Sequence, residues 1–348
     1  MAADIGTTGV ALALLDLSDG SAVARRGFLN PQRALGADVI SRISAAVNGR
    51  AEELRQLITQ GVARGARELL ASANASPERV RRVTVAANTV MAHLLLGLPC
   101  GSLGVYPFTP APMPNAAIDF EGVFGTGTGI NCPVRVIPWL GAYIGGDVTA
   151  GIAYVLHARK SGRFMLIDLG TNSELALYDG GAVRAASAAA GPAFGAGSAS
   201  RAVSELAQMI RGGLVDETGL LRERASGALT QEEIRGIQLA KSAVRAGVEI
   251  LTDGVPPPDA VYLAGGMGQS LDVNDAADIG LLPFPLSEKA RAIGNAALGG
   301  AARMLFEPYP NIETLNFTEV TLSAHPRFEE LFMEHLRFPP NRPPRSSC

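Results

Sequence analysis

The side chains best suited to phosphate chemistry lie near the middle of the chain, at Asp168, Gly170, Thr171 and Asn172. Strand-like runs precede and follow them, so the pattern predicts a β-hairpin with these residues at its tip. Gly170 lets backbone N–H groups approach an anion, and Thr171 and Asn172 add further donors. Asp168 can bind the metal ion that accompanies a phosphate. The stretch therefore predicts a phosphate-binding hairpin.

The same pattern occurs at the start of the chain, in Asp4, Gly6, Thr7 and Thr8, and leads into a predicted strand over residues 10–17. For a single hairpin, the alternative is an acidic residue that only stabilises a turn. The repetition weakens this alternative, because two matching hairpins predict a duplicated fold that holds one nucleotide from both sides.

Asp147 follows two glycines at the start of a small-residue helix predicted over residues 148–156. A carboxylate is favoured at a helix N-terminus for structural reasons alone, so Asp147 is either an N-cap or a reactive group. A buried strand over residues 260–264 ends in Gly265, Gly266 and Met267, and a helix with a small-residue face is predicted over residues 293–302. The amphipathic stretch 231–251 predicts a core helix.

The composition excludes several classes of function. The chain has 348 residues, 47% of them apolar, which is enough for two packed domains. The formal charge of −3 and the lack of long basic runs argue against nucleic-acid binding, and no apolar stretch is long enough to span a bilayer. With no recognisable secretory leader, we expect a cytoplasmic protein. The three cysteines lie too far apart to form an iron–sulfur or zinc site: Cys100, Cys132 and Cys348.

In order and chemistry these parts resemble the ASKHA superfamily of acetate and sugar kinases, heat-shock chaperone ATPases and actin. The matching parts are phosphate 1, connect 1, phosphate 2, adenosine and connect 2, at residues 4–8, 145–156, 167–174, 263–268 and 293–302. The resemblance implies an α/β fold of two duplicated ribonuclease-H-like lobes around a nucleotide cleft. The first lobe would comprise residues 1–156 and roughly 290–338, and the second lobe would comprise residues 157–289. Residues 339–348 would form a disordered tail.

One branch of this superfamily is more similar, the reductive activators of corrinoid proteins. The blocks that resemble it lie at residues 30–43, 94–97, 103–105, 189–194, 238–241 and 279–283. Members of that branch usually carry an N-terminal ferredoxin-like domain with a 2Fe–2S cluster, which this sequence lacks, so we expect a longer natural protein. The stretch 195–215 looks shorter than in the family, as though residues after Phe194 had been lost.

The resemblance implies a role for each predicted site residue. Gly6, Thr7 and Thr8 would bind phosphate from one lobe, and Gly170, Thr171 and Asn172 from the other. Hydrated Mg²⁺ would be held by Asp4 and Asp168. ATP would place its adenosine against the backbone of Gly265, Gly266 and Met267. Asp147 would orient the attacking water, whereas the role of Glu174 stays open.

The implied function is an ATPase that drives a Co(II) corrinoid protein back to Co(I) for a corrinoid-dependent methyltransferase, acting as a homodimer. Two alternatives stay open: a small-molecule kinase with the same fold, and a nucleotide-responsive scaffold without turnover. An activator of acyl-CoA dehydratases is disfavoured, because Cys100 and Cys132 lack the glycine-framed setting that a shared cluster requires.

Overall fold

The structure is a computed structural model that describes residues 1–114, 118–125, 127–159, 162–195, 198–222, 229–268, 270–306 and 315–340. The chain forms two compact units, Met1–Lys160 with Ala296–Thr314, and Ser161–Asn295 with Leu315–Cys348. Residues 315–338, which we expected in the first lobe, therefore lie in the second unit. Of the predicted tail, residues 341–348 lie outside the described residues.

The first unit is built on a six-stranded sheet with the order β3-β2-β1-β4-β6-β5. Strands β1 to β3 form an antiparallel meander, whereas β4 lies parallel to β1 and β6 lies parallel to β4. The short β5 adds to the edge in the antiparallel direction. The strands are β1 (Ala2–Ile5), β2 (Gly9–Leu15), β3 (Ala22–Leu29), β4 (Val83–Ala87), β5 (Ile118–Asp119) and β6 (Pro133–Val136).

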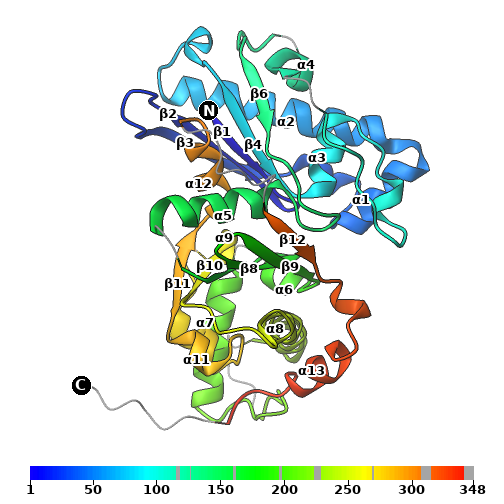
Figure 1. The fold of residues 1–348 in the computed structure, drawn as a ribbon, viewed down its shortest axis with the longest axis vertical. Coiled ribbons are helices and arrows are strands. Elements are labelled where there is room, and N and C mark those ends of the chain that lie inside the picture. The colour runs from blue at the N-terminus through cyan, green and yellow to red at the C-terminus, as the bar shows by residue number, and fades with distance from the viewer. Residues whose placement is uncertain are drawn as a thin grey trace. The chain divides into compact units, whose positions relative to one another are not determined.

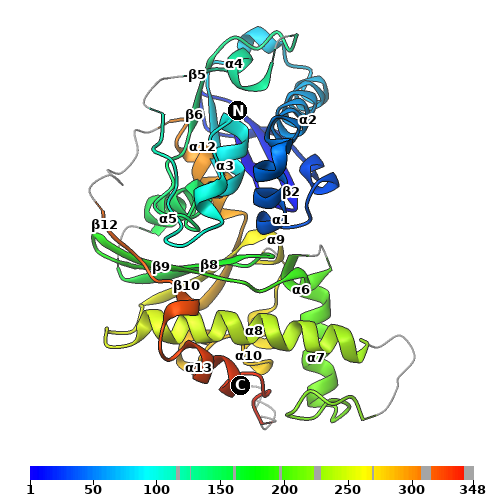
Figure 2. The same ribbon diagram turned by 90° about the vertical axis from the view of Figure 1, so that its right-hand side faces the viewer.

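Helices cover both faces of this sheet. Successive residues of a strand point to opposite sides, so apolar residues of one strand can contribute to the core on each face. In β1, Ala3 and Ile5 join the apolar core beneath α2, whereas Ala2 joins a second core with α5 and α12. Figure 2 shows α2 beside β2. The helices are α1 (Val39–Ala45), α2 (Ala51–Ser72), α3 (Thr89–Leu96), α4 (Phe120–Phe124), α5 (Gly146–Arg159) and α12 (Ala296–Arg303), with shorter turns η1 (Pro31–Ala34), η2 (Ala46–Arg50), η3 (Pro77–Arg79) and η4 (Gly101–Leu103).

The second unit also has a six-stranded sheet, with the order β11-β10-β7-β8-β9-β12. Strand β12 pairs parallel with β9, which explains why residues 315–338 belong to this unit. The strands are β7 (Phe164–Asp168), β8 (Ser173–Asp179), β9 (Ala182–Ala188), β10 (Ala260–Ala264), β11 (Ala290–Gly294) and β12 (Asn316–Glu319).

The long helix α8 packs along β8 and β9 of this sheet, and Figure 1 shows it end-on. Its N-cap is Thr230, whose side chain accepts from Glu233 N in a capping box. The core between α7, α8 and the sheet includes Met165 and Ile167. The helices are α6 (Pro192–Gly195), α7 (Ala199–Arg211), α8 (Gln231–Thr252), α9 (Gly265–Gly268), α10 (Val273–Asp278), α11 (Phe284–Ser287) and α13 (Phe328–Glu334), with the turn η6 (Leu322–Ala324).

Five strands of each sheet share one topology, β3-β2-β1-β4-β6 in the first and β9-β8-β7-β10-β11 in the second, whereas the edge strands β5 and β12 have no counterpart. In each, an antiparallel meander is followed by a parallel strand on the far side of its first strand, so that β1 corresponds to β7 and β4 to β10. This is the duplicated α/β fold that the two hairpins predicted. One detail was wrong: residues 290–294 form strand β11, and the helix predicted over 293–302 begins at Ala296.

None of the described helices combines the length and the apolar character needed to cross a bilayer.

Candidate functional site

The first predicted phosphate hairpin is present, with β1 ending at Ile5 and β2 beginning at Gly9. Gly6 N donates to Gly9 O at 2.9 Å, which closes the turn. A Cβ at Gly6 would lie 3.1 Å from Gly9 O, so a larger residue would strain this turn. The sequence therefore places Gly6, Thr7 and Thr8 at a tight tip, as predicted.

Side chains from three other elements hold this tip. Asn30 Nδ2 donates to Gly6 O at 2.9 Å, and Arg42 Nη2 donates to Thr7 O at 2.6 Å. Asn88, the N-cap of α3, donates from Nδ2 to Thr7 Oγ1 at 3.0 Å. Sequence reasoning missed these supports, although Asn30 and Arg42 fall in a block that resembles the family.

Two predicted acidic site residues, Asp4 and Asp147, belong to the first unit. Asp4 is in β1, level with Ala86 of β4, and Asp147 is the second residue of α5. The helix begins at Gly146, so Asp147 lies inside its first turn rather than at the N-cap. Burial and then the Asp4 charge raise the pKa of Asp147 to about 7, although Val148 N, which donates to Oδ1 at 2.8 Å, opposes the shift.

Two glycines bring Asp147 to this place. A Cβ at Gly145 would lie 2.5 Å from Asn88 Cα and 2.7 Å from Thr89 N, and one at Gly146 would overlap Ile137 O. Glycine is therefore required for the start of α5 to approach the start of α3 and the end of β6.

The second predicted hairpin is also present, between β7 and β8. Gly170 N donates to Ser173 Oγ at 3.4 Å, and Gly191 N donates to Thr171 O at 2.8 Å. A Cβ at Gly195 would overlap Thr171 Oγ1, so α6 also approaches this tip. Asp168 ends β7 directly opposite Glu174 of β8. The segment just before Phe194, which resembles a family block, thus supports the hairpin.

The predicted adenosine element joins β10 to α9. Gly265 has φ +90°, and a Cβ there would collide with Asp168 Oδ1 and Leu169 O, so its glycine serves the contact with the second hairpin. A Cβ added at Gly266 would meet no neighbouring heavy atom within 4 Å, so this residue faces open space. Met267 is only 4% exposed and lies in the core, so a ligand here would meet its backbone.

Each unit thus brings together one part of the predicted site. The first holds Asp4, Asp147 and the first tip, and the second holds Asp168, the second tip and Gly265. Among the described residues, no group of three or more His, Cys, Asp or Glu side chains could hold a metal ion. Asp4 and Asp168 each supply one carboxylate in the strand before a hairpin tip, and this donor set fits Mg²⁺, which takes one or two carboxylates together with phosphate oxygens and water.

The described cysteines do not fit a cluster. Cys100 and Cys132 are buried free thiols, and burial raises the pKa of both, to about 11 for Cys100. Cys348 lies outside the described residues.

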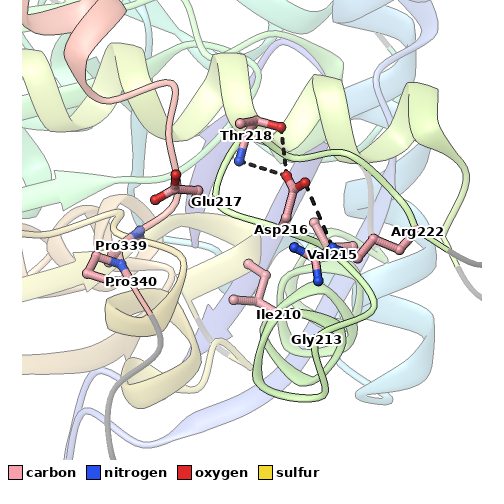
Figure 3. A pocket seen from close by; sticks show the side chains of 9 residues that line it. All are labelled: Ile210, Gly213, Val215, Asp216, Glu217, Thr218, Arg222, Pro339 and Pro340. Atoms are coloured by element: carbon pink, nitrogen blue, oxygen red, sulfur yellow. Dashed lines mark hydrogen bonds and ion pairs between the residues drawn. The ribbon is translucent and has the colours of Figure 1, made fainter.

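A pocket of about 400 Å³ lies elsewhere in the second unit and contains none of the predicted site residues. In Figure 3 the Asp216 carboxylate accepts from Thr218 N and Oγ1, so this acidic side chain stabilises its own turn. The lining residues are Ile210, Gly213, Val215, Asp216, Glu217, Thr218, Arg222, Pro339 and Pro340.

Comparisons with known proteins agree with the duplicated fold. Residues 1–159 match the family description "RACo middle region", and residues 163–204 and 214–346 match "C-terminal domain of RACo the ASKHA domain". The chain is 28% identical to the corrinoid activation enzyme RamQ of Eubacterium limosum, over 98% of this chain and 70% of the relative. It is similar to a solved structure of a reductive activator for corrinoid, iron-sulfur protein, with a TM-score of 0.86 and 25% identity, over 98% of this chain and 66% of that one.

Proposed function

We propose a function from the premise that this chain belongs to the RACo family, since the RACo middle region and the RACo C-terminal ASKHA domain match it in succession. The chain would be the ATP-binding and ATP-hydrolysing part of a reductive activator. That activator would return an inactive Co(II) corrinoid protein to Co(I) for a corrinoid-dependent methyltransferase. The single observation that carries the proposal is the pair of acidic, glycine-containing hairpin tips at equivalent strands of two duplicated sheets.

In this proposal each hairpin tip contributes to binding the phosphates of ATP. Backbone N–H groups and hydroxyls of Gly6, Thr7 and Thr8 act in the first unit. In the second unit the phosphates would be bound by the corresponding groups of Gly170, Thr171 and Asn172. Asp4 and Asp168 would hold hydrated Mg²⁺, which supplies charge neutralisation at the transferring phosphate.

Asp147 would orient the attacking water. Of the predicted acidic residues, Asp147 alone lies in the first turn of a helix. The two glycines before it allow the start of α5 to approach Asn88. Adenosine would lie against Gly265, Gly266 and the backbone of Met267, since a Cβ at Gly266 would meet no neighbouring heavy atom within 4 Å.

Hydrolysis would matter because reduction of Co(II) to Co(I) is unfavourable with ordinary donors. If ATP binds two conformations with different affinity, turnover can hold the corrinoid protein in a state that accepts the electron. One electron would pass from a reduced 2Fe–2S domain to cobalt, oxidising the cluster and giving Co(I). That domain would lie outside these residues.

The test is the rate of ATP hydrolysis with and without a purified Co(II) corrinoid protein and a reduced 2Fe–2S domain. We expect slow basal hydrolysis that changes when the corrinoid protein is added, together with spectroscopic formation of Co(I). Phosphate transfer to an added small acid or sugar would favour the kinase alternative. ATP binding without turnover would favour the scaffold alternative.

Asp147→Asn tests the assigned water-orienting residue. We expect kcat for ATP hydrolysis to fall by about 10²- to 10⁴-fold, the usual contribution of a positioned acid–base group, with ATP affinity little changed. Asp19→Asn, an exposed change in a turn of the same unit, is the matched control and should hydrolyse ATP like the wild type. Equal rates for the two variants would remove Asp147 from the mechanism.

A further inference from the structure

A buried polar cluster lies against the first hairpin tip, and none of its members was among the predicted site residues. We call Asn30, Gln32, Arg42 and Met91 the tip-support cluster. Arg42 Nη1 lies 2.9 Å from Met91 Sδ and 3.4 Å from Gln32 Oε1, and Asn30 Nδ2 lies 3.6 and 3.3 Å from the same two atoms. The side chains are almost fully buried, with Arg42 and Gln32 at 0% exposure and Asn30 at 1%.

This cluster binds consecutive carbonyl groups of the tip. Asn30 Nδ2 donates to Gly6 O and Arg42 Nη2 donates to Thr7 O. The backbone N–H of Asn30 donates to Thr8 O at 3.0 Å. Because Asn30 and Arg42 meet at the same two atoms, the carbonyls of Gly6 and Thr7 turn toward one side of the hairpin.

The direction of these carbonyls fixes the direction of the following amides. A trans peptide is planar, and its N–H points away from its C=O. The N–H groups of Thr7 and Thr8 therefore point away from the cluster, on one side of the tip. Successive N–H groups on one side form a concavity that binds anions.

Arg42 also places a positive charge beside the first hairpin tip. Its acceptors are Thr7 O, Gly36 O, Gln32 Oε1 and Met91 Sδ, and none of these described partners is a carboxylate. The Asp38 carboxylate, whose charge raises the pKa of Arg42, caps α1 by accepting from Ser41 N. Burial lowers the pKa of Arg42 to about 10, which leaves it charged at neutral pH. A buried cation without a hydrogen-bonded anion is costly to keep, so an anion held nearby would lower that cost.

The second tip shows that a cation is not needed merely to hold a carbonyl. There, the Thr171 carbonyl accepts from a neutral backbone group, Gly191 N, at 2.8 Å. The first tip instead uses the guanidinium of a fully buried arginine. This difference points to a role in binding negative charge.

We propose that Arg42 is a positioning residue for phosphate, which orients the Thr7 and Thr8 amides through Thr7 O and places a buried positive charge behind them. The inference rests on the proposed function, since it concerns how the first hairpin binds the phosphates of ATP. Arg42 acts through the tip and needs no direct contact with the nucleotide.

The test compares Arg42→Met with Arg26→Met by isothermal titration calorimetry of the full chain, using ATP with Mg²⁺ and, separately, adenosine. Arg26 lies on the surface, paired with Glu68, and is the matched control in the same unit. We expect Arg42→Met to weaken ATP binding by about 10- to 100-fold and to leave adenosine binding unchanged, because the Thr7 and Thr8 amides lose the orientation for their hydrogen bonds to the charged phosphate. Arg42→Lys, which keeps the charge, should recover part of the ATP affinity.

Asn30→Asp keeps the experiment decisive if Arg42→Met does not fold. The substitution is isosteric, but it replaces the donor to Gly6 O with a carboxylate oxygen and adds negative charge behind the tip. It should also weaken ATP binding and spare adenosine binding. ATP binding equal to that of Arg26→Met in the variant tested, or an equal loss of ATP and adenosine affinity, would overturn the inference. Failure of the wild type to bind ATP would instead refute the proposed function, and the inference with it.

Discussion

His93 in α3 shows what a single buried residue does in this fold. Its side chain is fully buried, Nδ1 lies 2.7 Å from Thr89 O, and Ala111 N donates to Nε2 at 3.0 Å. This pattern requires a neutral ring, with the proton on Nδ1. The two contacts attach the segment around Ala111 to α3.

The state of His93 predicts a pH dependence. Burial lowers the pKa of His93 in the folded chain, partly opposed by the Thr89 carbonyl. As the pH falls through about 6.5, the unfolded histidine takes up a proton that the folded one does not, so the free energy of unfolding falls. His93→Gln, whose amide oxygen can replace Nε2 as acceptor, should therefore lose less stability than the wild type between pH 7.5 and 5.5 in urea unfolding.

His157→Gln is the control for that measurement, because His157 is exposed. It should follow the wild type over the same pH range. If the free energy of unfolding of His93→Gln fell with pH as much as that of the wild type, the pH dependence would come from groups other than His93.

At the scale of elements, the close packing of α12 on α5 stands out because glycine makes it possible. A Cβ at Gly300 would overlap Ala150 O, so the two helices approach backbone to backbone. The small-residue face predicted over residues 293–302 had indicated such a contact. Since α5 carries Asp147 in its first turn, this packing also fixes the position of the predicted catalytic residue.

Gly300→Ala should therefore destabilise the protein although alanine favours helices. Overpacking usually costs about 1–3 kcal/mol, more than the roughly 0.5–1 kcal/mol that alanine gains over glycine in a helix, so the free energy of unfolding should fall. Gly236→Ala in α8 is the matched control, because its Cβ would meet only Ala193 Cβ at an ordinary 3.5 Å. Chemical denaturation of both variants measures the difference, and equal stability would show that α5 and α12 can separate at little cost.

The hairpins and the long helix α8 were predictable because local patterns determine them. Gly6 and Gly170 mark tight tips, and the apolar periodicity of residues 231–251 marks the helix. The edge strands β11 and β12 were missed, because each is short and its pairing comes from distant β10 and β9. Arg42 was missed for a similar reason: its partner Thr7 lies 35 residues away, and no local pattern signals that contact.

At the scale of the whole molecule, neither unit is one continuous segment. The chain passes from the first unit to the second, returns with residues 296–314, and ends in the second. The end of the described chain then attaches to α8: Gln238 Nε2 donates to Leu336 O at 2.9 Å, and Lys241 Nζ donates to Arg337 O at 2.5 Å. Two blocks that resemble the family, 238–241 and 279–283, meet here, since a Cβ at Gly280 would lie 2.9 Å from Pro339 Cγ.

This attachment predicts that removal of residues 336–348 destabilises the protein. Phe338 is only 2% exposed, and the Lys241 ammonium lies 5.0 Å from its ring. Truncation would remove a buried aromatic side chain, a loss of about 3–5 kcal/mol in a core, and would take the carbonyl acceptors from Gln238 and Lys241. Scanning calorimetry should show a lower Tm, whereas removal of residues 341–348 alone, which keeps Phe338, should leave it near the wild-type value.

A second substitution separates the two causes of that loss. Burial lowers the pKa of Lys241 to about 7, so the amine is costly to keep charged once Arg337 O is gone. Lys241→Met should therefore recover part of the Tm in the 336–348 truncation, yet lower it in the full chain, where it removes a satisfied hydrogen bond. If Lys241→Met shifted the Tm equally in both backgrounds, the amine and the chain end would be energetically independent, and the role of Lys241 in attaching the chain end would be refuted.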